Sequence, residues 1–202
     1  MEIAENAALI VVDVQKGFEE VEYWGERNNP EADDNIAALI GTWQESGRPV
    51  VFVRHDSAKP DSPLRSGYVG NDFKEYVEER RGKGAGGELL VTKSVNSAFY
   101  GTPDLDAWLK EAGVSQLVVT GIQTNMCAET TARMGGNLGY DVLFALDATY
   151  TFDLEGPFGW RLGAEEIARA TAVSLHGGGF ARVVTTADLI ARASSPSSPS
   201  GA

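Results

Sequence analysis

Three residues whose side chains can carry acid–base or nucleophilic chemistry each follow a short apolar run of the chain. They are Asp13, Lys93 and Cys127, and Cys127 is the only cysteine among 202 residues. A thiol can act as a nucleophile, a carboxylate can act as its general base, and an ammonium can hold that carboxylate ionised. The three types together would support nucleophilic chemistry at the thiol, assisted by the carboxylate and the ammonium.

Each of these residues also has a purely structural interpretation. A lone cysteine is often a small buried apolar side chain, an aspartate after a strand often accepts loop hydrogen bonds, and a lysine there is usually solvated. A helix that begins near Cys127 would instead direct backbone N–H groups at the sulfur and lower the pKa of the thiol. The residue types alone leave both interpretations open.

Histidine is the usual base for a catalytic cysteine, and the chain contains two, His55 and His176. His55 ends an apolar run, so a dyad of Cys127 and His55 is a second possible mechanism. His176 precedes Gly177-Gly178-Gly179, where capping of a helix end is the simpler interpretation.

The elements that must position these residues can be predicted from hydrophobic periodicity. Apolar runs predict six strands, and segments with helical spacing lie between them, two of which stop at Gly47 and Gly113. Because the runs are almost continuously apolar, both faces of the sheet should be covered. The pattern predicts an α/β fold, a three-layer α/β/α sandwich with a doubly wound six-stranded parallel sheet. The predicted strands are residues 8–12, 50–53, 88–92, 117–120, 142–146 and 182–184, and the predicted helices are residues 36–43, 72–80, 105–112, 127–138, 164–175 and 187–191.

In such a fold, ligands bind beyond the carboxyl ends of the strands, the edge at which Asp13, Lys93 and Cys127 should meet. Two long loops, residues 16–29 and 55–71, are expected to wall a pocket at this edge. Candidate pocket residues are Phe18, Trp24, His55, Tyr68, Phe99 and Tyr100.

Composition excludes several classes of function. The formal net charge of −12 and a pI near 4.6 disfavour binding to nucleic acid or to an anionic membrane. No apolar run approaches the ~20 residues that span a bilayer. With one cysteine and no signal-peptide pattern, we expect a cytoplasmic protein. We expect residues 1–193 to form a single domain and the Ser- and Pro-rich residues 194–202 to be a disordered tail.

Three motifs in this order resemble the isochorismatase-like cysteine hydrolases, the superfamily of nicotinamidases and N-carbamoylsarcosine amidohydrolases. The motifs are Leu9-Ile10-Val11-Val12-Asp13-Val14-Gln15, then Val91-Thr92-Lys93 with Ser97-Ala98-Phe99 and Gly101-Thr102, and finally Gly121-Ile122-Gln123-Thr124-Asn125-Met126-Cys127.

The resemblance implies a catalytic triad of Asp13, Lys93 and Cys127. It also implies a cis peptide between Ile122 and Gln123, with an oxyanion hole formed by the backbone N–H groups of Gln123 and Cys127.

The implied activity is hydrolysis of an amide or carbamoyl C–N bond in a small molecule through a Cys127 thioester. Nicotinamidase-like members carry a D-x-H metal motif where this chain has Arg54-His55-Asp56-Ser57, so we expect neither a metal nor another cofactor. Two alternatives remain: an isochorismate-type vinyl-ether hydrolase that uses Asp13 as the acid, and a non-catalytic binding protein on the same fold. A homo-oligomer, dimer or tetramer, is expected.

Overall fold

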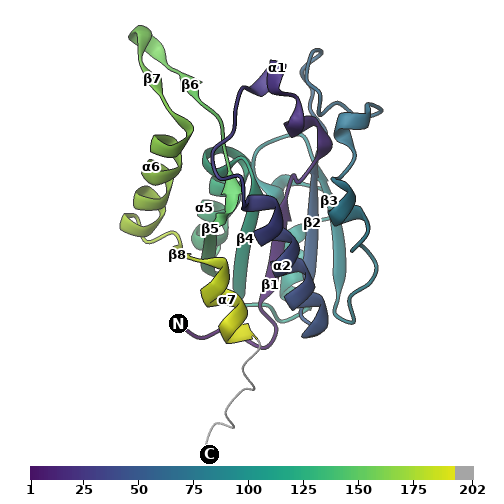
Figure 1. Ribbon diagram of the computed structural model, residues 1–202. Coiled ribbons are helices and arrows are strands. Elements are labelled where there is room, and N and C mark those ends of the chain that lie inside the picture. The colour runs from purple at the N-terminus through teal and green to yellow at the C-terminus, as the bar shows by residue number, and fades with distance from the viewer. Residues whose placement is uncertain (194–202) are drawn as a thin grey trace, which may run out of the picture.

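A six-stranded parallel sheet, in the order β3-β2-β1-β4-β5-β8, forms the centre of the molecule (Figure 1). The computed structural model describes residues 1–193, so the predicted disordered tail lies outside the described residues. The predicted fold class and all six strands are confirmed. The strands are β1 (Ala8–Val12), β2 (Val50–His55), β3 (Glu88–Lys93), β4 (Gln116–Ile122), β5 (Asp141–Tyr150) and β8 (Arg182–Val184).

Helices cover both faces of the sheet, which explains why the strands are apolar throughout. Every residue of β1 is buried: Leu9 and Val11 belong to the hydrophobic cluster that includes α2 and α7, while Ile10 belongs to the cluster beneath α4, α5 and α6. The helices are α1 (Val21–Trp24), α2 (Ala32–Glu45), α3 (Glu75–Glu78), α4 (Leu105–Glu111), α5 (Glu129–Asn137), α6 (Ala164–Gly177) and α7 (Thr186–Ala193).

Helices α2 and α4 end next to Gly47 and Gly113, the two glycines at which the sequence predicted helix ends. Gly47 after α2 has a φ of 68°, and Gly113 after α4 has a φ of 66°. Glycine adopts this left-handed conformation without the steric penalty of a side chain, so both positions can end a helix.

Three elements differ from the prediction. The helix expected from residue 127 begins earlier, as a single π turn, η4 (Thr124–Ala128), that continues into α5. The helix expected over 72–80 is reduced to α3. Strand β5 runs past a register shift to Tyr150, which pairs with Ile122, so the end of β5 lies beside the end of β4.

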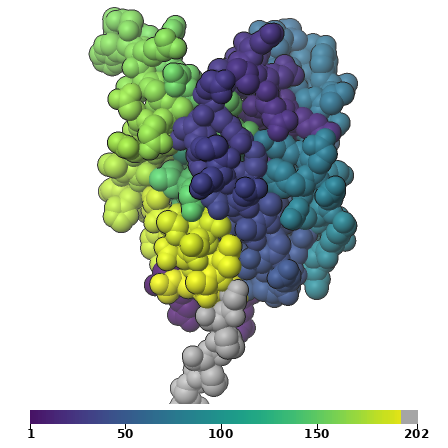
Figure 2. Space-filling view, in the orientation of Figure 1, coloured from purple at the N-terminus to yellow at the C-terminus, as the bar shows by residue number. Residues whose placement is uncertain are grey.

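A short antiparallel hairpin was not predicted. Strands β6 (Leu154–Glu155) and β7 (Arg161–Leu162) pair with each other and not with the central sheet. We call residues 154–162 the arm; it projects from the body beyond α6 at the upper left of Figures 1 and 2.

No helix within residues 1–193 has the length and apolar character needed to cross a membrane.

Candidate active site

The carboxyl ends of four neighbouring strands bring the predicted catalytic residues together. Asp13 follows β1, His55 and Lys93 end β2 and β3 as register partners, and Cys127 lies just beyond β4. These residues are 34 to 114 positions apart in the sequence, and only the parallel register places them at one edge.

Asp13 and Lys93 form a fully buried ion pair. The Lys93 Nζ lies 2.6 Å from Asp13 Oδ2, and both side chains are 0% exposed. Burial alone would lower the pKa of Lys93, but the negative groups beside it, Asp13 first, raise it, so the ammonium stays charged. The other oxygen of this carboxylate, Oδ1, is buried without a hydrogen-bond partner in the described part of the chain. It is therefore free to accept a proton.

His55 contacts the same ammonium. Its Nδ1 lies 3.2 Å from Lys93 Nζ, and because an ammonium can only donate, Nδ1 must accept. Burial, followed by the charge of Lys93, lowers the pKa of His55 below its ordinary value. The imidazole is therefore neutral, with its proton on Nε2.

Gln15 fixes the end of β2 against β1. Its side-chain amide donates to the His55 carbonyl oxygen at 3.0 Å, and its Oε1 accepts from the His55 N–H at 2.9 Å. The same amide donates to the carbonyl oxygen of Asn71 at 2.8 Å. The glutamine of the first motif thus positions His55 and, through it, Lys93.

Cys127 sits in the turn that joins β4 to α5, residues 121–128, which we call the catalytic turn. The peptide between Ile122 and Gln123 is cis, as the resemblance implied. Gly121 has a φ of 113°, and a Cβ there would collide with the Val12 carbonyl oxygen, so only glycine lets β4 pass this close to β1.

Threonines at the end of β5 anchor the catalytic turn. The Thr124 hydroxyl donates to Thr149 Oγ1 at 2.9 Å, and the Thr151 hydroxyl donates to Asn125 Oδ1 at 2.5 Å. Because β5 is longer than predicted, these contacts could not be foreseen from the sequence. They hold the segment around the thiol to the sheet.

The pKa of the Cys127 thiol is raised, which makes the prediction of a lowered value wrong. Burial is the largest cause and the adjacent Asp13 carboxylate the second, while Lys93 opposes them. The thiol lies 4.0 Å from Asn96 Oδ1, to which it can donate. Cys127 therefore rests as a neutral thiol and needs a base to become a nucleophile.

A cavity of about 200 Å³ opens above these groups. Phe18, Tyr23 and Trp24 form one wall, with ring centroids 5.0 Å apart for Phe18 and Trp24 and 4.7 Å apart for Tyr23 and Trp24. The Trp24 indole N–H donates to the Gly17 carbonyl oxygen at 2.9 Å, which fixes the loop. The full lining is Asp13, Phe18, Tyr23, Trp24, His55, Ser57, Lys59, Ser62, Leu64, Asn96, Gln123, Met126 and Cys127.

The structure brings three of the six candidate pocket residues to this cavity, Phe18, Trp24 and His55. The other three do not line it. Tyr68 and Tyr100 are 55% and 70% exposed, and Phe99 stacks on Tyr140 at 6.0 Å against the core.

Sequence reasoning missed several lining residues, among them Tyr23, Asn96 and Met126. Tyr23 lies in a loop already expected to wall the pocket, and Met126 lies inside the third motif, so both could have been found. Asn96 had no sequence signal beyond its place three residues after Lys93.

Ligand atoms of Asp13, His55 and Cys127 lie within 4.8 Å of one another, the arrangement of a small metal site. The Lys93 ammonium, however, already binds Asp13 Oδ2 and His55 Nδ1. A divalent cation held by these atoms would face a fixed positive charge at contact distance. The residues present therefore do not fit a metal ion.

Comparisons with known proteins identify the family and agree with the fold. Residues 7–188 match the family model described as the isochorismatase domain. The chain is 39% identical to the uncharacterized isochorismatase family protein YrdC of Bacillus subtilis, over 92% of this chain and 95% of that protein. It is 31% identical to nicotinamidase 3 of Arabidopsis thaliana, over 88% and 84% of the two chains. The crystal structure of an isochorismatase-family protein from Chromobacterium violaceum superposes with a TM-score of 0.87 at 36% identity, over 96% of each chain.

Proposed function

The chain belongs to the isochorismatase family of hydrolases, and from this premise we propose that it is a metal-independent cysteine hydrolase that cleaves the C–N bond of a small amide or carbamoyl compound. One observation carries the proposal. The Cys127 thiol lies within 4.8 Å of Asp13, whose Oδ1 is buried and unpaired, at the base of a cavity of about 200 Å³.

Acylation begins when Asp13 takes the thiol proton as the sulfur attacks the substrate carbonyl carbon. A C–S bond forms, and the carbonyl oxygen becomes an oxyanion that the backbone N–H groups of Gln123 and Cys127 stabilise. Asp13 then passes the proton to the departing nitrogen, and the C–N bond breaks. The products of this half-reaction are an amine or ammonia and a thioester on Cys127.

Deacylation reuses the same carboxylate. Asp13 removes a proton from a water molecule as its oxygen attacks the thioester carbon, and the C–S bond breaks. The sulfur leaves as a thiolate and recovers its proton from Asp13. The carboxylic or carbamic acid is released.

The two neighbours of Asp13 have supporting roles. Lys93 pairs with the carboxylate and offsets the charge of the developing thiolate. His55 accepts from Lys93 through Nδ1, so its other nitrogen carries a proton and cannot receive one from Cys127. This disfavours the Cys127–His55 dyad.

Cavity size favours a small substrate. About 200 Å³ is below the ~300–1,000 Å³ of pockets that hold drug-sized ligands. The aromatic wall would contact an apolar or planar portion of the molecule, next to the carbonyl that Cys127 attacks. The nicotinamidase relative acts on an amide, which supports the C–N bond as the target.

The test uses the variants Cys127→Ala and Asp13→Asn on a panel of small amides and N-carbamoyl compounds, with ammonia release as the readout. Both should lose about 10³-fold or more in kcat/KM, because nucleophile and base act as a unit. Intact mass spectrometry of the quenched wild-type reaction should find an acyl adduct on Cys127.

Turnover that survives in Cys127→Ala but not in Asp13→Asn would overturn the thioester route. The vinyl-ether alternative has its own test: pyruvate release from isochorismate that survives in Cys127→Ala but is lost in Asp13→Asn would support it in place of C–N hydrolysis. Turnover that survives in both variants would exclude this site altogether.

A further inference from the structure

The aromatic wall of the active-site cavity is carried by a short piece of chain with little regular structure of its own. Residues 18–27, which we call the wall segment, contain Phe18, Tyr23 and Trp24 of the cavity lining. The segment consists of the end of the 3₁₀ turn η1 (Lys16–Glu19) and the four-residue helix α1, none of whose residues is buried. A helix this short is not stable alone in water, so other parts of the molecule must hold the wall segment in place.

A cluster of charged and polar side chains outside the cavity is centred on Asp33, in the first turn of α2. The Asp33 carboxylate accepts from Lys74 Nζ at 3.0 Å through both of its oxygens. It also accepts from Arg27 Nη1 at 2.7 Å and from the Tyr76 hydroxyl at 2.9 Å. We call these four residues the charge cluster. None of them lines the active-site cavity.

The charge cluster holds the wall segment near both of its ends. Near the start of the segment, Glu19 Oε1 lies 3.2 Å from Lys74 Nζ, and the Lys74 side chain is only 4% exposed. At the end of the segment, Arg27 is paired with Asp33. Because Lys74 and Asp33 also bind each other, they join residue 19 to residue 27. The aromatic residues between these two points are confined by that bridge.

Aromatic contacts link the charge cluster to the cavity. The Arg27 guanidinium lies 4.4 Å from the centroid of the Tyr150 ring. Tyr150 meets Phe152 edge-on with centroids 5.8 Å apart, and Phe152 stacks on Trp24 at 5.5 Å and on Phe18 at 6.4 Å. A cation over a ring face and neighbouring aromatic rings each prefer defined geometries. A shift of Arg27 would therefore be passed on to the rings that wall the cavity.

The central carboxylate of the charge cluster stays ionised at neutral pH. Burial alone would raise the pKa of Asp33, but Lys74, Arg27 and Tyr76 outweigh it and hold that pKa below its ordinary value. An amide in place of this carboxylate has nearly the same shape and no charge. It would leave two cations, Lys74 and Arg27, without their common counter-charge, which is a strongly unfavourable arrangement for partly buried groups.

We propose that Asp33 and Lys74 are positioning residues for substrate binding: through Glu19 and Arg27 they fix the aromatic wall and so set the affinity of the active-site cavity for its substrate. The inference rests on the proposed function, because it assigns two residues outside the cavity to the binding step of that reaction. Supporting residues of this kind keep binding groups in their productive geometry. Since neither residue contacts the reacting groups, their loss should act on KM more than on kcat.

The test compares Asp33→Asn with the matched control Asp106→Asn. On α4, Asp106 also binds a lysine, Lys110 at 2.6 Å, and a tyrosine hydroxyl, that of Tyr140 at 2.8 Å. Its side chain is 26% exposed, against 23% for Asp33. Asp33→Asn should raise KM about tenfold for an amide that the wild type hydrolyses, with less than about threefold change in kcat. Asp106→Asn should leave both constants unchanged.

A second measurement needs no turnover. Hydrogen exchange followed by mass spectrometry should show about tenfold faster exchange in residues 16–29 of Asp33→Asn, with unchanged exchange in β1 and β4. Within this range the Gly25 N–H donates to the Val21 carbonyl oxygen at 2.8 Å, a bond that reports the opening of α1. In Asp106→Asn, residues 16–29 should exchange as they do in the wild type.

Milder variants decide the matter if Asp33→Asn does not fold. Glu19 is 62% exposed, so Glu19→Gln removes one end of the bridge at little cost to folding and should shift KM and exchange in the same direction by a smaller factor. Arg27→Met should raise KM as Asp33→Asn does. Arg27→Lys, which keeps the positive charge beside Asp33, should restore most of the wild-type KM.

Three results would overturn the proposal. They are a folded Asp33→Asn with wild-type KM or wild-type exchange in residues 16–29, equal effects in the two aspartate variants, and faster exchange throughout the chain, which would assign the change in KM to general destabilisation. If the wild type hydrolyses no compound of the panel, the proposed function fails instead. Exchange in residues 16–29 then decides by itself whether the charge cluster holds the wall segment.

Discussion

The buried pair of Asp13 and Lys93 holds two opposite charges away from water. Removing both ions from water is costly, and removing one partner is worse, since it leaves an uncompensated buried charge. A lysine at a strand end would ordinarily be solvated, and its burial here depends on an aspartate 80 residues earlier. The pair is thus a structural requirement of this edge of the sheet, in addition to its role in the proposed mechanism.

Replacing Lys93 with Met should lower the free energy of unfolding by about 3–5 kcal/mol and abolish turnover, because Asp13 loses its counter-charge. Urea denaturation and kcat/KM provide the two measurements. The control is Lys110→Met: this lysine pairs with Asp106 at 2.6 Å but is 62% exposed, and its loss should cost less than about 1 kcal/mol. Equal losses in the two variants would contradict this account.

The lowered pKa of His55 predicts how activity depends on pH on the acid side of the profile. This lowered pKa keeps the imidazole neutral at neutral pH, so activity is present there and is lost only as the pH falls through that lowered pKa, which lies below the ordinary histidine value of about 6.5. Protonation would remove the acceptor for Lys93 and add a second positive charge beside it.

The variant His55→Asn keeps an acceptor but cannot titrate, so it should retain activity at neutral pH and lose this acid limb of kcat/KM. His55→Phe should be weak at every pH, and His176→Asn, at the end of α6, should keep the wild-type profile. An acid limb unchanged in His55→Asn would assign the titration to another group.

The candidate catalytic residues could be identified from the sequence, but their pKa shifts and hydrogen-bond partners could not. The three motifs identify Asp13, Lys93 and Cys127 because each motif is local. The direction of the Cys127 pKa and the partner of His55 depend on side chains distant in sequence, whose spacing only the folded register sets.

At the scale of elements, the strands carried strong sequence signals and the segments around the site carried weak ones. Continuous apolar runs predict buried parallel strands well. The π turn η4 and the extension of β5 depend on tertiary contacts, such as Thr124 with Thr149, that no local pattern encodes. The arm was missed because strands of two residues have no measurable periodicity.

The loop between β1 and α2 forms the aromatic wall of the active-site cavity, and Trp24 is its centre. Trp24 stacks on Phe152 at 5.5 Å and holds Phe18 in place. Trp24→Ala should raise KM about tenfold or more with a smaller change in kcat, since the wall binds substrate and does not react. Tyr100→Ala, which removes an exposed ring, should leave KM unchanged; equal effects would place the substrate elsewhere.

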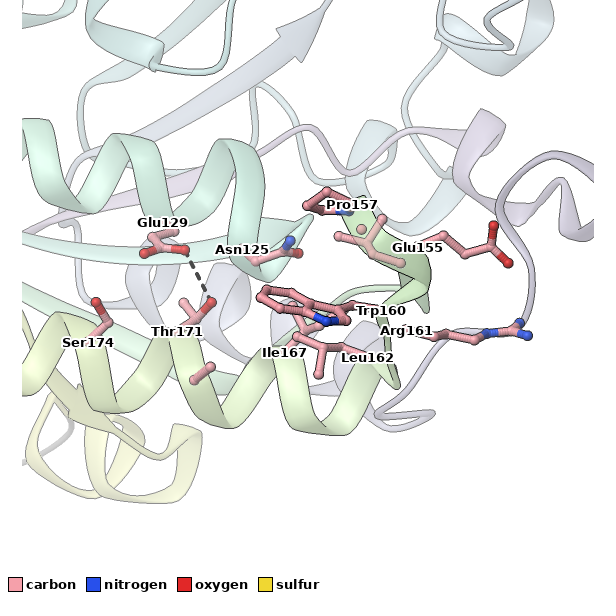
Figure 3. Close-up of a pocket in the computed structure, with 13 residues that line it drawn as sticks. Asn125, Glu129, Glu155, Pro157, Trp160, Arg161, Leu162, Ile167, Thr171 and Ser174 are labelled. Atoms are coloured by element: carbon pink, nitrogen blue, oxygen red, sulfur yellow. Dashed lines mark hydrogen bonds between the residues drawn. The ribbon is translucent and has the colours of Figure 1, made fainter.

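For the molecule as a whole, the catalytic turn lies between two cavities of different character. Met126 and Cys127 line the small active-site cavity, while Asn125, together with Glu129 of α5, lines a second cavity of about 810 Å³ between α6 and the arm (Figure 3). The three-layer fold was predictable because alternating strands and helices permit few topologies. The second cavity was not predictable, since it exists only where α6, the arm and the catalytic turn meet.

The single thiol makes access to the active-site cavity measurable by chemical labelling. Cys127 is the only sulfhydryl in the chain and lies 8% exposed at the base of a cavity of about 200 Å³. A thiol-selective reagent must enter this cavity before it can react with Cys127. The labelling rates of a series of thiol reagents of increasing width would therefore measure the width of the opening beside Trp24, and the stoichiometry of labelling would count the molecules whose thiol is accessible.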